Sequence, residues 1–155
     1  MTSLFPAIFC LFSLLGSDPV TQEGPRVTRI NPMAGELTWL LKDEFSRSHN
    51  QSRKTIVMMD ATWCSACKQF IQLAKKPVLR TALKAVTIVA VDVDEWGGSA
   101  LREAGFSVKK IPSFFRIRAS GYPRGKPLTP AAWPSNKPER AAEAFRKFLE
   151  DDSSF

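Results

Sequence analysis

The sequence predicts an α/β protein in which helices flank a central mixed β-sheet, and three observations lead to this class. Apolar segments of strand length, TIVMMDA at residues 55–61 and VTIVAVDV at residues 86–93, alternate with segments of helical periodicity. Strands separated by helices run parallel in one sheet. A later stretch turns back at Gly121 and adds an antiparallel edge, so the sheet is expected to be mixed.

The first half of the chain carries two predicted helices around a buried strand. A helix is expected from Met33, because apolar residues recur there at three- and four-residue steps: Leu37, Leu40, Leu41 and Phe45. The strand at residues 55–61 follows a polar loop. A second helix runs through CKQFIQLAKK, and Pro77 interrupts it, so that residues 78–85 form a kinked or separate piece.

The second half begins with the β-branched strand at residues 86–93. We expect a turn at residues 94–99, which contain two adjacent glycines, and then a short helix that ends at Gly105. Residues 108–118 contain Ile111-Pro112 and then SFFRIR. There Phe115 and Ile117 alternate with Arg116 and Arg118, which is typical of a strand with one wet face. The proline-rich residues 122–138 are expected to be an irregular loop with at most a short edge strand, and residues 139–150 an amphipathic helix.

The N-terminus is apolar from residue 4 to residue 15, which is shorter than the roughly 20 residues that cross a bilayer. Its length suits a secretory signal, although no Lys or Arg stands near the start. We expect residues 1–17 to be a signal peptide or a hydrophobic N-terminal segment, residues 18–32 a linker, and residues 33–152 the domain. The protein is then periplasmic or otherwise exported, and the alternative is a cytoplasmic protein.

The composition fits one globular domain, with 155 residues of which 44% are hydrophobic. The formal net charge of +7 favours acidic partners such as anionic lipid headgroups, nucleic acid or acidic proteins. The basic residues are scattered along the chain, however, and no nucleic-acid-binding motif is present. We interpret the charge as a solvated basic surface, and expect a monomer that binds no nucleic acid.

The stretch WCSAC, residues 63–67, contains the candidate reactive residues of the chain, the cysteines Cys64 and Cys67. A pair of cysteines spaced in this way can hold a metal, close a structural disulfide or exchange electrons. A structural zinc site needs four ligands, and only Cys10 and His49 remain to complete one. A structural disulfide stabilises most when it closes a long loop. We therefore expect a redox-active pair and no metal.

The predicted position of this pair supports redox chemistry. Cys64 follows a strand and begins a helix, whose positive N-terminus and unpaired amides stabilise a thiolate. Cys67 lies one turn further, on the protected side, where it can attack a mixed disulfide. Trp63 adds a flat apolar wall. The mechanism requires Cys64 to be ionised and reachable.

A second signal is the dipeptide Ile111-Pro112, which opens a predicted strand. An X–Pro bond at this place is a candidate for a cis peptide. A cis proline would leave the backbone groups of the preceding residue free to pair with an extended peptide. The alternative is an ordinary trans proline at the start of a strand.

The combination of WCSACK after a buried strand with KKIPSFF far downstream resembles the thioredoxin superfamily. The segment from Met33 through KTIVMMDATWCSACKQF is most similar to the thioredoxin-like domain of the thiol:disulfide interchange protein DsbD and related exported proteins. The resemblance covers residues 32–118 and implies a thioredoxin-like fold. By this resemblance, Cys64 would be the nucleophile and Cys67 the resolving thiol. Pro112 would be the cis proline, and Ile111 and Trp63 would bind the substrate.

The sequence departs from the family pattern at one functional position. Thioredoxins usually carry a buried carboxylate six residues before the first cysteine, and Met58 stands there in this chain. Asp60 lies two residues further along the same strand face and is a candidate for proton transfer. The alternative is that Asp60 caps a loop or a helix entry.

We expect a thiol–disulfide oxidoreductase that reduces protein disulfides by dithiol exchange, without a metal or an organic cofactor. Its electrons would come from a thiol donor, and a membrane reductase is the candidate if the protein is exported. Two alternatives remain open. The first is a thioredoxin-like binding module that uses the cis-proline groove, together with Trp133 and the proline-rich stretch, with little turnover. The second is a disulfide oxidant.

Overall fold

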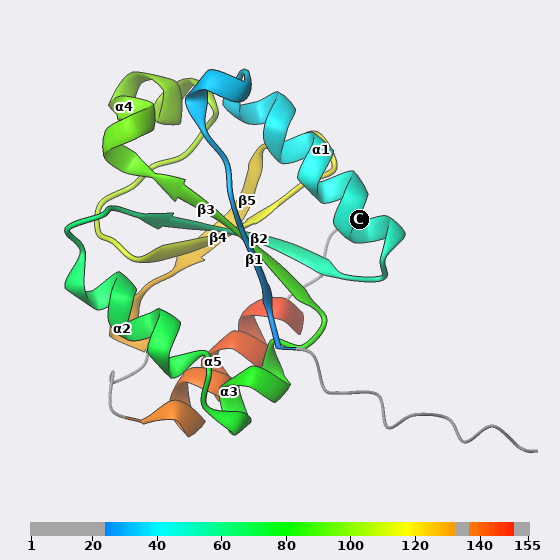
Figure 1. Ribbon diagram of the computed structural model, residues 1–155, viewed down its shortest axis with the longest axis vertical. Helices are drawn as coiled ribbons and strands as arrows, with labels where there is room; N and C mark the ends of the chain where they lie inside the picture. Colours follow the sequence, from blue (N-terminus) through cyan, green and yellow to red (C-terminus); the bar gives the residue numbers. More distant parts are fainter. Residues whose placement is uncertain (1–23, 133–136, 151–155) are drawn as a thin grey trace, which may run out of the picture.

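A computed structural model describes residues 24–132 and 137–150. Within these ranges the chain forms a five-stranded sheet with helices on both faces (Figure 1). The expected signal segment with Cys10, the first part of the expected linker, and Trp133 lie outside the described residues. None of the helices in the described part is both long and apolar enough to span a membrane.

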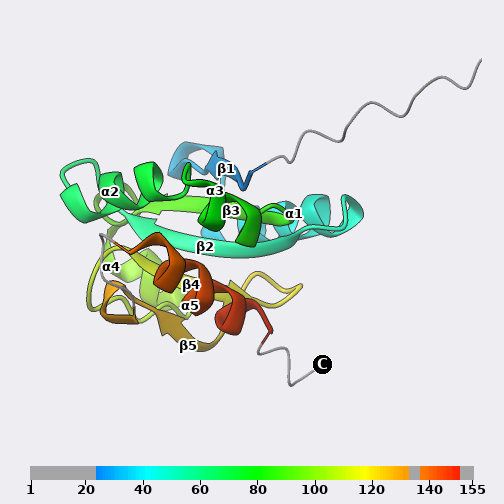
Figure 2. The same ribbon diagram turned by 90° about the horizontal axis from the view of Figure 1, so that it is seen from below.

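The strands follow the order β1-β3-β2-β4-β5 across the sheet, from one margin to the other in Figure 2. The bounds are Arg26–Arg29 for β1, Lys54–Asp60 for β2, Val86–Asp92 for β3, Ser113–Ile117 for β4 and Pro123–Leu128 for β5. β1, β3 and β2 are parallel, whereas β4 pairs antiparallel with β2 and β5 antiparallel with β4. The predicted mixed sheet is confirmed.

Five α-helices surround this sheet in the described ranges: α1 Leu37–Asn50, α2 Ser65–Leu73, α3 Pro77–Ala82, α4 Val93–Glu103 and α5 Pro138–Glu150. Figure 1 shows α1 and α4 on one side of the sheet, and α2, α3 and α5 on the other. α1 starts later than expected, because residues Pro32–Ala34 form a short 3-10 helix and Gly35 adopts a φ of 146°.

The central strand β2 explains why two separate apolar layers form. Ile56 and Met58 face the α2, α3 and α5 side, whereas Val57 and Met59 face the α1 and α4 side. All four are fully or almost fully buried, as expected for a strand covered on both faces. On the α2 side, three aromatic rings pack with centroids 4.6–5.5 Å apart: Phe70, Phe114 and Phe145.

The linker expected over residues 18–32 is wrong where the structure describes its second part. Arg26–Arg29 forms strand β1, which pairs with β3 from Arg26 opposite Thr87 to Arg29 opposite Ala90. The segment is short and polar, and the side chain of Val27 remains half exposed. Its β-structure therefore depends on hydrogen bonds to β3 rather than on an apolar pattern that the sequence would reveal.

The turn expected at residues 94–99 is also wrong, because α4 already begins at Val93. The Asp92 carboxylate accepts hydrogen bonds from the backbone amides of Asp94 and Glu95, at 2.9 and 3.3 Å. This N-cap starts the helix before the glycines are reached. Only Gly97 departs from helical geometry, with a φ of 71°, and it kinks the helix instead of ending it.

The hairpin between β4 and β5 contacts α1 through Gly121. Gly121 is buried and has a φ of 87°. A Cβ atom at this position would overlap the carbonyl oxygen of Thr38. The turn therefore needs glycine both for its backbone conformation and for its close approach to the helix.

We expect Gly121→Ala to lower the free energy of unfolding by about 2 kcal/mol or more, because alanine disfavours this φ and collides with α1. Urea denaturation monitored by circular dichroism measures the change. Gly98→Ala is the matched control: this glycine lies in α4, and a Cβ would meet only the mobile end of Arg102. That variant should be unchanged or up to about 1 kcal/mol more stable. Equal effects of the two substitutions would contradict the expectation.

Candidate active site

The predicted site residues meet at one edge of the sheet. The parallel strands β2 and β3 both end there, at Asp60 and Asp92, and the loop after β2 leads directly into α2. Pro112 precedes β4, whose first residue Ser113 pairs with Met59 near the end of β2. The sheet register therefore brings the segment around Pro112 to the same edge as the two cysteines.

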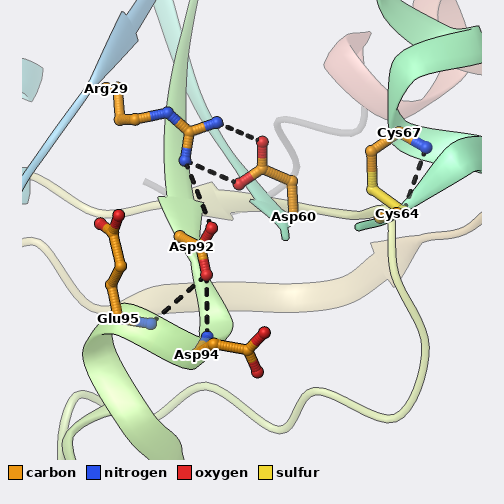
Figure 3. A network of polar contacts seen from close by, with 7 residues as sticks. All are labelled: Arg29, Asp60, Cys64, Cys67, Asp92, Asp94 and Glu95. Atoms are coloured by element: carbon orange, nitrogen blue, oxygen red, sulfur yellow. Dashed lines mark hydrogen bonds and ion pairs between the residues drawn. A yellow bond between two sulfur atoms is a disulfide. The ribbon is translucent and has the colours of Figure 1, made fainter. Parts of the chain in front are cut away.

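Cys64 and Cys67 form a disulfide with a Cα–Cα distance of 5.3 Å. Cys64 is the N-cap residue of α2, and its Sγ accepts a hydrogen bond from the Cys67 backbone amide at 3.1 Å. Figure 3 shows the pair at the start of this helix. The partial positive charge of the helix N-terminus thus acts directly on the Cys64 sulfur.

Both cysteines are well covered, each with 3% of its surface exposed. In this oxidised form the Cys64 sulfur is therefore largely shielded, and the reachability of the reduced thiol stays a prediction. Its side chain folds back to cap α2, and both residues pack in an apolar cluster with Ala61 and Phe70. A partner must therefore approach the disulfide through the small exposed part of this surface.

Trp63 is the exposed apolar feature beside the cysteines, with 66% of its surface accessible. Its indole Nε1 donates a hydrogen bond of 2.6 Å to a carboxylate oxygen of Asp94, in the first turn of α4. Asp92 caps that turn, as Figure 3 shows. Sequence reasoning missed Asp94, although an acidic residue directly after a strand end was a usable signal.

The Ile111–Pro112 peptide bond is cis, as the family resemblance implied. Pro112 is buried, and Ile111 is partly buried against both apolar layers. The Ser113 hydroxyl donates a hydrogen bond to the Lys110 carbonyl, which closes the loop around the proline. Pairing of the Ile111 backbone with a substrate stays a prediction.

Asp60 is buried, with 6% of its surface exposed, and it faces an arginine that sequence reasoning missed. Its carboxylate accepts two hydrogen bonds from Arg29, at 3.1 and 2.6 Å (Figure 3). Hydrogen bonding to Asp60 raises the pKa of Arg29 above its ordinary value. Arg29 also lies 4.0 Å from the Asp92 carboxylate. Asp60 therefore joins β2 to β1, and its part in proton transfer stays a prediction.

The thioredoxin family model matches residues 36–126. The chain belongs to the thioredoxin family. No curated protein matches it. Among solved structures, thioredoxin from Trypanosoma brucei brucei is 19% identical over 86% of this chain and 99% of that one, with a TM-score of 0.50. The disulphide isomerase from Xylella fastidiosa Temecula1 is 15% identical over 75% and 93% of the two chains, with a TM-score of 0.56. At these identities the two structures show the fold alone.

Family membership and the Cys64–Cys67 disulfide together support a thiol–disulfide oxidoreductase. In this chain, nevertheless, an apolar layer surrounds the two cysteines. Met58, at the position where the family usually has a carboxylate, is 1% exposed and belongs to the same cluster as both cysteines. Within residues 24–132 and 137–150, no group of histidine, cysteine, aspartate or glutamate side chains is arranged to hold a metal ion.

We expect Asp60→Asn and Arg29→Gln each to lower the free energy of unfolding by about 1–3 kcal/mol, because each breaks a charge-assisted pair that involves a buried carboxylate. Chemical denaturation measures the loss. Arg26→Gln is the control, since the side chain of this β1 arginine bonds, among the described residues, to the exposed Gln51 alone. If the double variant loses no more unfolding free energy than either single variant, the two residues act as a pair. Strictly additive losses of unfolding free energy would contradict this pairing.

Proposed function

We propose that this protein reduces protein disulfides by dithiol exchange between its Cys64–Cys67 pair and a substrate. The observation that carries the proposal is the disulfide at the start of α2, where the Cys67 amide donates to the Cys64 sulfur. The same amide and the helix N-terminus stabilise negative charge on Cys64 once the bond is reduced. The leading sulfur is thereby favoured as the nucleophile.

The exchange takes two steps that balance in atoms and electrons. The Cys64 thiolate attacks one sulfur of a substrate disulfide, and the other substrate sulfur leaves as a thiolate. The Cys67 thiol then loses its proton and attacks the Cys64 sulfur, which releases the second substrate thiolate. Two electrons pass to the substrate, its two sulfurs take up protons, and Cys64–Cys67 becomes the disulfide. A dithiol donor returns the pair to its reduced state.

The surroundings of the pair suit an extended peptide as substrate. Trp63 offers an exposed apolar face that Asp94 holds in one orientation. The Ile111 backbone precedes the cis proline. This position supports the proposal that its polar groups pair with a substrate strand. Both residues lie at the edge of the sheet to which the cysteines belong, so binding and exchange would take place on one surface.

The resemblance of the isoleucine before the cis proline, and of the flanking segments, to DsbD-type reductants supports the reducing direction. We further propose that the protein is exported and takes electrons from a membrane reductase, with its net charge of +7 assisting contact with an acidic surface. Processing of the expected signal in a secreting host, followed by mass spectrometry of the mature chain, tests the export.

We expect the purified protein to accelerate the reduction of insulin by dithiothreitol. Its Cys64–Cys67 couple should have a reduction potential near about −270 mV, as in reducing thioredoxins. Titration in glutathione or dithiothreitol buffers, read by alkylation of the free thiols, measures it. A potential near about −120 mV would make the protein an oxidant and overturn the proposed direction.

We expect Cys67→Ser to accumulate mixed disulfides through Cys64, because the second step is blocked while the first remains. Non-reducing gels of a reaction with reduced and reoxidised insulin detect these adducts. Cys64→Ser is the matched control and should form none. Adducts that persist equally in both variants would contradict the assignment of Cys64 as the leading nucleophile.

The burial of both cysteines favours a second candidate, a binding module with little turnover. Each cysteine is 3% exposed, whereas the adjacent Trp63 is 66% exposed. A partner could then contact Trp63 and the cis-proline segment without reaching the disulfide. In that case insulin reduction would stay at the rate of dithiothreitol alone, and the wild type would bind the same partners as Cys64→Ser.

A further inference from the structure

The loop that carries the cis proline also carries two adjacent lysines. Lys109 and Lys110 directly precede Ile111 and Pro112, and both lysines are exposed. Two contacts hold this loop in place: the Ser113 hydroxyl donates to the Lys110 carbonyl, and Ile111 packs against the apolar cluster that contains both cysteines. The backbone of Lys110 is therefore held near the disulfide, while its side chain remains accessible to a partner.

The charges of these lysines are not neutralised by the rest of the described chain. In residues 24–132 and 137–150, the side chains of Lys109 and Lys110 form no ion pair and no hydrogen bond. The same holds for Lys68, which is exposed in the first turn of α2 and follows Cys67 directly. A substrate carboxylate can pair with such ammonium groups without displacing a partner that they already have.

The acidic side chains at the same edge of the sheet have partners of their own. Asp60 accepts two hydrogen bonds from Arg29, and Asp92 caps α4 and lies 4.0 Å from the same arginine. Figure 3 shows Arg29 in contact with both carboxylates. Asp94 accepts the hydrogen bond of the Trp63 indole. These carboxylates are occupied, so they leave the lysines of the loop free for the acidic side chain of a partner.

The first turn of α4 contributes the opposite charge to this surface. Asp94 and Glu95 are exposed there, next to Trp63, which is bonded to Asp94. An acidic side chain of a substrate is therefore favoured at the cis-proline loop and disfavoured beside Trp63. The attraction is local to one side of the disulfide and differs from a general effect of the net charge of +7.

The position of the lysines determines which part of a substrate they reach. A peptide that pairs in extended form with the Ile111 backbone advances about 3.3 Å per residue, and directly opposite side chains lie about 5 Å apart. When the substrate cysteine is bonded to Cys64, the residues that pass Lys110 and Lys109 are those within about three positions of that cysteine. The lysines therefore contact the immediate flank of the disulfide.

We propose that Lys109 and Lys110 make this protein select disulfides in which an acidic residue lies within about three positions of the attacked cysteine. This selection rests on the proposed exchange at Cys64 and names the substrate class of that same site, which is an acidic segment of an extended protein chain. The ammonium groups bind the substrate carboxylates, which accelerates encounter and fixes the register of the peptide. They determine specificity and take no part in the transfer between sulfurs.

Reduction of short disulfide-cyclised peptides tests the selection. In one set the three residues before the first cysteine are all glutamate, glutamine or lysine, and in a second set the same residues follow the second cysteine. Each rate is divided by the rate with dithiothreitol, because flanking charges also change the intrinsic reactivity of a disulfide. In at least one set, we expect the glutamate peptide to react at least about fivefold faster than the lysine peptide at low salt. The ratio should shrink at about 500 mM sodium chloride, because salt screens exposed charges.

Substitution of the two lysines tests their part in this ratio. Lys109→Gln with Lys110→Gln should lower the ratio about threefold or more, and Lys109→Glu with Lys110→Glu should invert it. The matched control is Lys84→Gln with Arg146→Gln, which removes two exposed charges after α3 and on α5 and should keep the ratio. All four side chains are exposed, so we expect the variants to fold, and circular dichroism checks this.

Two results would overturn the selection: equal normalised rates for the three peptides of both sets, or a control variant that lowers the ratio as much as the lysine variant does. A complete lack of peptide reduction would instead contradict the proposed exchange. Binding of the same peptides to a Cys64→Ser, Cys67→Ser variant, measured by fluorescence anisotropy, then decides on the lysines. A glutamate preference that Lys109→Gln with Lys110→Gln removes would support the selection, and equal binding of all peptides would refute it.

Discussion

The burial of β2 on both faces is the constraint on which the rest of the structure depends. Two apolar layers meet on this strand, with Met58 in one layer and Met59 in the other. Neither side chain can be exposed to water without opening the layer to which it belongs. The strand is thereby held between β3 and β4 in a single register. The loop after its carboxyl end leads to Cys64 at the start of α2. The same register places Pro112 at the sheet edge where the cysteines lie.

The elements that the sequence predicted well are those whose signal is local. β2 and β3 are continuous apolar runs, α5 has one apolar stripe, and the CxxC pair lies where a strand meets a helix. The cis proline was found only because the family resemblance added to a local pattern that also fits a trans bond. These features need no knowledge of distant residues.

The features that sequence analysis missed depend on partners far along the chain. β1 has only four residues and is mostly polar, and it is a strand because its backbone pairs with β3. The Arg29–Asp60 pair joins residues 31 positions apart, as does the Trp63–Asp94 bond. At α4 two local signals compete, and the Asp92 cap outweighs the adjacent glycines because it satisfies two amides at the start of the helix. The sequence also showed basic residues as scattered, whereas the sheet gathers five of them around one groove at the end opposite the cysteines.

The pairing of β1 with β3 also bears on where this domain can be shortened. Without residues 26–29, the outer edge of β3 would present its backbone amides and carbonyls to solvent along an apolar strand that β1 now covers. Such an edge is a template for strands of other molecules. A shortened chain that begins at Met33 would therefore tend to self-associate, even with its cysteines and its helices intact.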